Sequence, residues 1–411
     1  MRFELLFLDA VDSSLGRVDH ASLSQQALME MVIDGITNKE KICGDADEPK
    51  DIEEWMGVTI EDGKVAEIKF FNCDIQGSLQ LEWLPSSVRE FDLGYNELSG
   101  TLDFTYLPTS MKWLDLSINK FTGPIDLERL PERMEDLNVS HNKLSGSLNL
   151  ASLPDTLMHF VAFANQFSGS INLTRLPVAL VWLDLPMNQL SGSVVLTQLP
   201  GRLNKLQLAN NRLSGSLDLT KLPSSMTRLK VSNNSFSGTV DLSQLADLSG
   251  KTEVLSLFWN QLAGSLALDR LPAAVRKLVL SKNKFTGEIS LENLPIGLKI
   301  LALANNKLSG TICLTSLPPA LEILALQNNN FEGSLDFTQL PESMEGMYLQ
   351  GNRFSGTIDL GNIRESITYF DVRENALSGT VQVPEQMYRK FNGALGASCF
   401  VGNNDLIVER V

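Results

Sequence analysis

Histidine and cysteine, the residues that most often bind metals or act as nucleophiles, are scarce in this chain of 411 residues. It contains three histidines and four cysteines, namely His20, His141, His159, Cys43, Cys73, Cys313 and Cys399. The cysteines do not show the paired spacing of zinc sites, and no phosphate loop, nucleophile elbow or kinase signature is present. We therefore expect that the protein is not an enzyme and that it uses no cofactor and no metal.

Long apolar runs and an excess of positive charge are lacking too. No segment reaches the length of a membrane span, and residues 1–10 make a poor signal peptide because they carry Glu4 and Asp9. The chain has 49 acidic and 34 basic residues, a net charge of -15, which disfavours a surface that follows nucleic-acid phosphates. We expect no nucleic-acid binding and no membrane insertion. The poor signal peptide favours the cytoplasm, whereas a longer start encoding a signal peptide would indicate the cell surface or secretion.

What the chain has in abundance is one repeat of 23 residues. Each unit carries a glycine at the same place, and these are Gly77, Gly100, Gly123, Gly146, Gly169, Gly192, Gly215, Gly238, Gly264, Gly287, Gly310, Gly333, Gly356 and Gly379. A fixed period in this range indicates a solenoid. A solenoid is one continuous body that grows lengthwise, because each unit stacks on the next.

Within a unit the apolar residues follow the pattern L-x-x-L-x-L-x-x-N-x-L, as in Met111, Leu114, Leu116, Asn119 and Phe121. The L-x-L alternation predicts a short strand with one buried face, and stacked units then form a parallel sheet. Alternation after the glycine, as in residues 147–150, predicts a second short strand before a Leu-Pro turn. The pattern predicts an α/β repeat fold, a right-handed curved leucine-rich repeat solenoid with a parallel concave sheet and an irregular convex side.

Asparagine recurs at the ninth position of the pattern, where an amide without partners would be costly to bury. Its two donors and one acceptor can satisfy the turn backbones of neighbouring units. We expect such a column at Asn96, Asn119, Asn142, Asn165, Asn188, Asn211, Asn234, Asn260, Asn283, Asn306, Asn329, Asn352 and Asn375, with Cys73 in the first unit. Each repeat glycine is expected to adopt a positive φ or to approach another backbone.

Units that end in Leu-Ser-Gly-Ser or Phe-Ser-Gly-Thr resemble the plant-type leucine-rich repeat class, and similar arrays occur in protist surface antigens. Trp55-x-Gly57-Val58 resembles the element that opens many plant-type ectodomains, and Phe400-x-Gly402-Asn403 resembles their closing element. The resemblance covers nearly the whole chain and implies the repeat fold.

Three positions depart from the plant-type pattern. In that class cysteines bracket the opening and closing elements, but here Glu53, Ile60 and Ile407 occupy those places. Without those bridges the two caps must hold by packing, which suits either a reducing compartment or a lineage that has lost the bridges. Whether Cys43, Cys73 or Cys399 forms a disulfide stays open. The chain contains neither a kinase domain nor a membrane span, which excludes the plant receptor-kinase architecture for this chain.

The sequence predicts three parts: residues 1–62 form an extension and helical cap, 63–382 an array of about fourteen units, and 383–411 a C-terminal cap. A capping box at residues 22–25 followed by helical spacing predicts a helix over residues 23–36. The first strand is expected near residues 65–70. A three-residue insertion between Leu245 and Val254 predicts a bulged loop on the convex side.

The third, fifth, seventh and eighth positions of the pattern are expected to face solvent on the concave side. Large apolar and charged groups gather there, and we take these as the partner-binding residues: Tyr95, Trp113, Asp136, His159, Phe163, Trp182, Lys205, Arg228, Lys230, Phe258, Trp259 and Tyr348. Trp and Tyr are favoured anchors of interfaces, although each one can instead simply cover a neighbouring side chain. We expect a monomeric scaffold that binds a protein or peptide. The alternative is a structural or adhesive surface-coat protein that acts by avidity.

Charges on this face are segregated, with acids in the early units and lysine or arginine in the middle ones. Asp92 beside Asp115 indicates contact with a basic partner or a weak calcium site, and the competing interpretation is a solvated acidic face. Asp136, His159 and Trp182 are expected to lie in register on adjacent strands. The hydroxyl of Ser140 is expected too far from that pair for nucleophilic activation.

Overall fold

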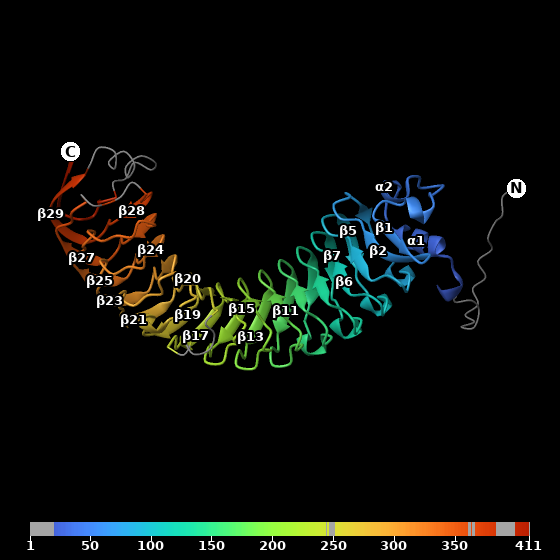
Figure 1. Cartoon of the computed structure of the whole chain (residues 1–411), viewed down its shortest axis with the longest axis horizontal. Helices are drawn as coiled ribbons and strands as arrows, with labels where there is room; N and C mark the ends of the chain where they lie inside the picture. Colours follow the sequence, from blue (N-terminus) through green and yellow to red (C-terminus); the bar gives the residue numbers. More distant parts are fainter. Residues whose placement is uncertain are drawn as a thin grey trace.

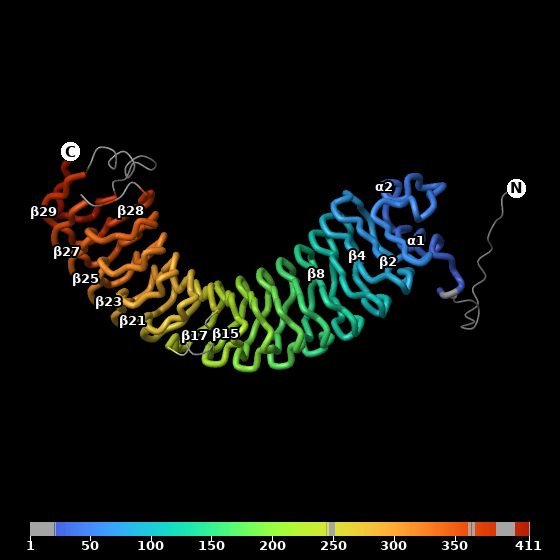
Figure 2. The backbone as a smooth tube through the Cα atoms, viewed as in Figure 1, coloured from blue at the N-terminus to red at the C-terminus, as the bar shows by residue number. Residues whose placement is uncertain are grey.

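The computed structural model describes residues 20–243, 245, 251–360, 363, 366–383 and 399–410. The chain forms a long curved array, with α1 (Gln25–Ile33) and α2 (Glu40–Cys43) at its N-terminal end (Figures 1 and 2). Its core is one continuous cluster of buried side chains that runs from α1 to Phe400. No helix among the described residues is long and apolar enough to cross a bilayer.

One strand of each unit joins a first sheet of fifteen strands, in which successive units pair in parallel. In the C-terminal half of Figure 1 this sheet lies on the inner side of the arc. Its strands are β1 (Val58–Glu61), β2 (Lys64–Lys69), β4 (Glu90–Asp92), β6 (Trp113–Asp115), β8 (Asp136–Asn138), β10 (His159–Val161), β12 (Trp182–Asp184), β14 (Lys205–Gln207), β16 (Arg228–Lys230), β18 (Val254–Ser256), β20 (Lys277–Val279), β22 (Ile300–Ala302), β24 (Ile323–Ala325), β26 (Gly346–Tyr348) and β28 (Tyr369–Asp371).

A second sheet of fifteen strands runs beside the first. Its strands are β3 (Gln76–Gly77), β5 (Glu97–Thr101), β7 (Lys120–Gly123), β9 (Lys143–Gly146), β11 (Gln166–Ser170), β13 (Gln189–Ser193), β15 (Arg212–Gly215), β17 (Ser235–Thr239), β19 (Gln261–Gly264), β21 (Lys284–Glu288), β23 (Lys307–Thr311), β25 (Asn330–Gly333), β27 (Arg353–Gly356), β29 (Ala376–Val383) and β30 (Asp405–Arg410).

The second strand differs in position from the sequence prediction. From β3 to β27 it ends at the repeat glycine or one residue later, whereas residues 147–150 were expected to form it after the glycine. Only β29, in the last unit, continues past its glycine to Val383. In the unit of residues 147–150 a short 3-10 helix follows instead, η6 (Leu150–Ser152). The apolar residues after the glycine, Leu148 and Leu150, are buried although they belong to no strand. Their alternation with polar residues therefore indicates burial and not strand pairing. The other 3-10 helices are η1 (His20–Ser22), η2 (Ile52–Glu54), η3 (Leu81–Trp83), η4 (Phe104–Tyr106), η5 (Leu127–Arg129) and η7 (Leu268–Arg270).

The predicted asparagine column is confirmed by its hydrogen bonds. In a typical unit the amide of Asn165 donates to the carbonyl of Val139 in the preceding unit, at 2.9 Å. Its Oδ1 accepts from the backbone N–H of Leu144, at 3.0 Å. The column also has a member that the 23-residue spacing did not reveal, because Asn403 bonds the backbone of Leu377 and Val372 in the same way. The closing element therefore extends the column by one unit.

The N-terminal cap contains a shorter helix than expected and one strand that was not expected. The helix α1 covers Gln25–Ile33 rather than residues 23–36, and the side chain of Ser24 accepts from the N–H of Ala27 at its start. The strand β1, which the sequence prediction missed, pairs antiparallel with β2 through a turn at Asp62 and Gly63. Both turn residues have positive φ, as a tight hairpin turn requires. This hairpin covers the open edge of the first sheet.

At the other end of the array, β30 pairs in parallel with β29 and Phe400 is buried. Residues 246–250 of the predicted insertion loop lie outside the described residues. So do residues 1–10, which the sequence analysis judged a poor signal peptide, and residues 384–398 of the predicted cap. All four cysteines are free, with Cys43 and Cys399 buried. Burial raises the pKa of the Cys399 thiol to about 12, which makes it a poor nucleophile.

Candidate functional site

The solvent-facing side of the first sheet, which we call the ladder face, brings six of the predicted residues into one row. Parallel pairing places them side by side on consecutive strands from β6 to β16. This central row consists of Trp113, Asp136, His159, Trp182, Lys205 and Arg228. The predicted register of Asp136, His159 and Trp182 is confirmed.

Side chains within the central row contact one another directly. Nδ1 of His159 lies 2.5 Å from Oδ1 of Asp136, and the ring of His159 meets Trp182 edge to face with 6.3 Å between centroids. Nζ of Lys205 lies 4.9 Å from the centroid of Trp182 on its other side, a cation–π arrangement. These contacts hold the side chains of the row against one another.

Buried polar atoms without partners gather at the centre of the ladder face. Within the described residues, the indole Nε1 of Trp182, Oδ1 of Asp184 and Nε of Arg228 are buried and have no hydrogen-bond partner. Lys230 projects from the same strand as Arg228. Burial lowers the pKa of Lys230, with repulsion from Arg228 and Lys277 as lesser causes. Unpaired buried polar groups are costly in a folded protein.

Asp184 is the most buried charged group of this cluster, with only 6% of its surface exposed. Burial raises the pKa of its carboxyl from 3.8 to about 6, although a hydrogen bond from Gln207 and the nearby charges of Lys230 and Arg228 act in the opposite direction. The carboxylate is therefore less stable in the folded protein than in the unfolded chain.

Asp184→Asn is expected to stabilise the protein at neutral pH. Because the folded-state pKa lies above the unfolded value, ionisation destabilises the fold as pH rises from about 4 through about 6. The amide removes this cost, so we expect on the order of 1 to 2 kcal/mol of stabilisation at pH 7 and almost none at pH 3.5. Urea denaturation at both pH values measures the effect. Equal stabilisation at the two pH values would contradict the assignment.

Four bulky side chains occupy backbone positions that disfavour them. The eighth position of the repeat has a positive φ throughout the described units, and asparagine fills it at Asn72, Asn210, Asn233, Asn305 and Asn328. At the same position Tyr95, Ile118, Met187 and Trp259 have φ values from 53° to 62° and are 40–55% exposed. Bulky residues rarely adopt this conformation, whereas asparagine adopts it readily. Their place on the ladder face is consistent with a role in contact with a partner.

The remaining predicted residues form smaller aromatic groups along the ladder face. Trp259 packs edge-on against Phe258, and Nζ of Lys282 lies 4.2 Å from the centroid of Trp259. The other contacts join Phe163 to His141, Tyr348 to Tyr369 and Tyr95 to Phe71. Phe71 and Tyr369 were not among the predicted site residues.

The seventh position is less exposed than predicted. Phe163 and Phe258 are only half-buried, but Ser117, Ser140 and Ser281 at the same position are buried. Phe71, at the same position in the first unit, is 56% exposed.

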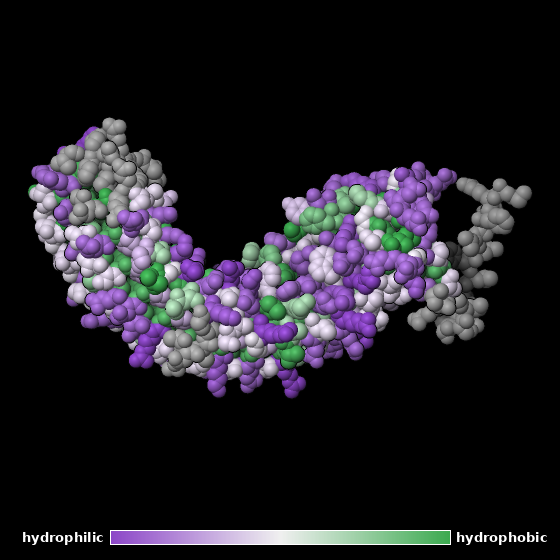
Figure 3. Space-filling model, in the orientation of Figure 1, coloured by the Kyte–Doolittle hydropathy of each residue, from purple (hydrophilic) through white to green (hydrophobic). Residues whose placement is uncertain are grey.

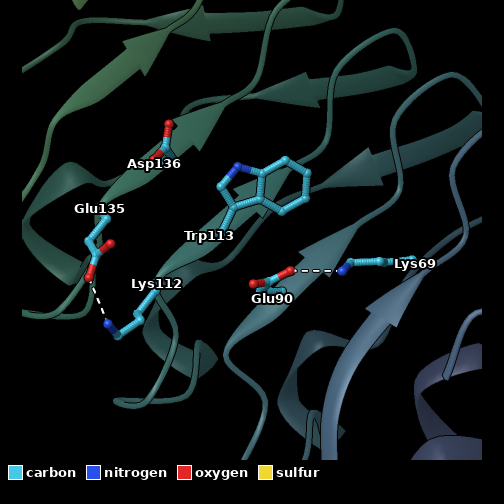
Figure 4. A pocket seen from close by; sticks show the side chains of 6 residues that line it. All are labelled: Lys69, Glu90, Lys112, Trp113, Glu135 and Asp136. Atoms are coloured by element: carbon cyan, nitrogen blue, oxygen red, sulfur yellow. Dashed lines mark hydrogen bonds and ion pairs between the residues drawn. The ribbon is translucent and has the colours of Figure 1, made fainter. Parts of the chain in front are cut away.

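A hollow of about 550 Å³ lies at the N-terminal part of the ladder face, around Trp113 (Figure 4). Its other lining residues are Lys69, Glu90, Lys112, Glu135 and Asp136. The sequence interpretation missed Lys112 and Glu135, because the second position of the repeat was not assigned to the binding face. Charged residues occupy that position in three consecutive units, Arg89, Lys112 and Glu135, and this was the available signal.

The paired aspartates Asp92 and Asp115 lie side by side as expected. Oδ1 of each accepts a local backbone N–H, from Gly94 and Ser117 respectively. Burial raises the pKa of Asp92, a backbone hydrogen bond from Gly94 opposes this, and the charge of Asp115 raises it further. The described residues include no group of three or more His, Cys, Asp or Glu side chains that could hold a metal ion.

The chemistry of the central row does not include an activated hydroxyl. Oγ of Ser140 donates to Oδ1 of Asn138 at 2.7 Å, whereas the imidazole of His159 bonds Asp136. The surface in Figure 3 is largely hydrophilic with small separate hydrophobic patches along the arc.

No family model matches the chain, and a search of curated proteins finds no match. Solved structures do match its fold. The structure titled as a TDR receptor is 22% identical, with 84% of this chain and 67% of that chain covered and a TM-score of 0.54. YopM from Yersinia enterocolitica is 26% identical over 79% of this chain and 65% of its own length, with a TM-score of 0.54.

YopM from Yersinia pestis, described as a leucine-rich effector protein, is 24% identical, covers 84% of this chain and 88% of its own length, and gives a TM-score of 0.53. These likenesses, together with the stacked parallel strands, confirm the predicted solenoid fold.

Proposed function

We propose that this leucine-rich repeat solenoid is a non-catalytic protein-recognition scaffold that binds a protein or peptide partner on its ladder face. The central row carries the proposal, because it sets two tryptophans, a histidine and two cations side by side on rigid strands. Such residues are the usual anchors of interfaces. A receptor and bacterial effectors with the same fold make a binding role the natural one for a solenoid.

The ladder face offers anchors at three points along its length. Trp113 and Trp182 lie on β6 and β12, and Trp259 is the third residue after β18. These strands are separated by the same number of units, so an extended partner can meet all three. A partner held at several points gains affinity without requiring one deep pocket.

The triple variant Trp113→Ala, Trp182→Ala, Trp259→Ala is expected to lose its partner. Truncation of a central aromatic anchor costs roughly 2 kcal/mol, so three together should abolish capture. The measurement is affinity purification from native lysate and surface extract, followed by binding isotherms with the purified partner. Unchanged denaturation of the variant would show that the loss is not due to unfolding.

A matched control removes exposed apolar groups elsewhere on the chain. Tyr106→Ala, Val178→Ala, Ile296→Ala changes three side chains that are 51–74% exposed and lie outside the first sheet. It is expected to keep the partner. Loss of the partner from the control, or its full retention by the tryptophan variant, would contradict the ladder face as the binding surface.

A further inference from the structure

The three tryptophans of the ladder face differ in one respect. Nζ of Lys205 lies 4.9 Å from the ring centroid of Trp182, and Nζ of Lys282 lies 4.2 Å from that of Trp259. No lysine or arginine of the described residues lies over the ring of Trp113. The chain thus supplies a cation to two of these rings and none to the third.

Carboxylates surround the ring that lacks a cation. Glu90, Glu135 and Asp136 line the hollow beside Trp113 (Figure 4), and Asp115 projects from the same strand as Trp113. Asp92 pairs with Asp115 across adjacent strands. Like charges on neighbouring strands repel one another unless a cation relieves them.

The lysines of the hollow are already engaged. Nζ of Lys69 lies 2.7 Å from Glu67 and 2.9 Å from Glu90, and Nζ of Lys112 lies 2.8 Å from Oε1 of Glu135. Neither lies over the indole. The side chain of Asp136 has only His159 as a charged partner among the described ion pairs, and that imidazole carries charge only when protonated.

We propose that the hollow around Trp113 is a subsite for a guanidinium or ammonium side chain of the partner, which lies on the indole ring, pairs with Asp136 and shares Glu90 with Lys69. This inference rests on the proposed function, because it names the chemistry that one part of the ladder face recognises. An aromatic ring with carboxylates beside it suits a cation in two ways, since the ring face attracts the charge and the carboxylates accept its N–H donors. The partner segment over β4 to β8 is therefore basic.

The charge of the ladder face reverses toward its middle. Lys205, Arg228 and Lys230 follow within three strands of His159. A basic side chain is attracted to the Trp113 end and repelled from the middle, so the charge pattern fixes the position of the basic segment along the array. Specificity of this kind arises as much from repulsion of the basic segment at the wrong units as from its attraction to the right ones.

The test uses the full chain and two short peptides. The probe is acetyl-Gly-Gly-Arg-Gly-Gly-amide, and its control replaces arginine by citrulline, which has nearly the same shape but no charge. Binding is followed by NMR at the indole N–H signals of the 15N-labelled protein, with Trp113→Leu used to assign one of them. We expect a saturable shift of the Trp113 signal that is larger than those of Trp182 and Trp259, and at least about fivefold weaker binding of citrulline.

Two variants with the same change in charge separate a specific subsite from general attraction to an acidic protein. Glu90→Gln, Asp136→Asn removes carboxylates of the hollow and should weaken arginine-peptide binding about tenfold. Glu97→Gln, Glu332→Gln removes exposed carboxylates of β5 and β25 in the second sheet and should leave binding within about twofold. Equal weakening by both variants, or equal binding of citrulline, would overturn the subsite.

The subsite and the proposed function can fail separately. If the triple tryptophan variant loses its partner but the Trp113 signal does not shift when the arginine peptide is added, the cation subsite is wrong and ladder-face recognition stands. If the peptide binds at Trp113 as expected while the natural partner is kept by the tryptophan variant, the subsite is supported and the proposed function is overturned.

Discussion

Asn188→Ala is expected to destabilise the solenoid by about 3 to 5 kcal/mol, because one buried side chain bonds four backbone groups in three neighbouring turns. Its Nδ2 donates to the carbonyls of Ala162, Leu185 and Pro186. Its Oδ1 accepts from the N–H of Phe167 at 3.0 Å. Alanine can replace none of these bonds, and the site is too buried for water to do so freely. Urea denaturation followed by circular dichroism gives the change in the free energy of unfolding.

Asn293→Ala provides the control for the asparagine column. Asn293 is exposed and lies in a turn outside both sheets. Its replacement is expected to change the free energy of unfolding by no more than about 0.5 kcal/mol. If the two variants unfold at the same urea concentration, the amide column is not the stabilising element that the hydrogen bonds indicate. The position of Asn188 in mid-array matters, because each unit contacts only its neighbours and a defect there weakens both sides.

Gly77→Ala is expected to detach the N-terminal cap from the array. Gly77 has a φ of 110°, and a Cβ added there would lie 2.2 Å from the carbonyl oxygen of Gly35. The segment after α1 pairs closely with β3 at this point, with Ile36 bridged to Gly77 and the N–H of Ser78 bonded to Gly35 at 2.9 Å. The backbones must separate to admit a methyl group. We expect about 2 to 4 kcal/mol of destabilisation, with faster amide hydrogen exchange in α1.

Gly63→Ala is the control that separates the two effects of Gly77→Ala, namely the steric clash of the added Cβ and the conformational cost of alanine at a positive φ. Gly63 has a φ of 71°, yet an added Cβ would meet nothing within 4 Å. This variant should lose only the conformational term, about 1 kcal/mol, and exchange in α1 should stay unchanged. Faster exchange of α1 in Gly63→Ala to the same extent as in Gly77→Ala would count against steric contact as the cause.

On the ladder face, the sequence predicted which residues are neighbours but not how their side chains are placed. The 23-residue period placed Trp113, Asp136 and His159 at equivalent positions, and parallel stacking in register then made their adjacency predictable. The period does not specify where a side chain lies above the sheet. The burial of Asp184, the lysine over Trp182 and the hollow at Trp113 therefore appeared only in the structure.

The sequence by itself determined the solenoid, the asparagine column and the face on which large side chains gather. These features are local and periodic, so one unit repeats the information of every other. Only the tertiary structure decided where the second strand ends, how β1 and α1 close the first unit, and that Asn403 continues the column at the last. The reason is physical: the end units have a neighbour on one side only, so their conformation depends on contacts that no repeat pattern contains.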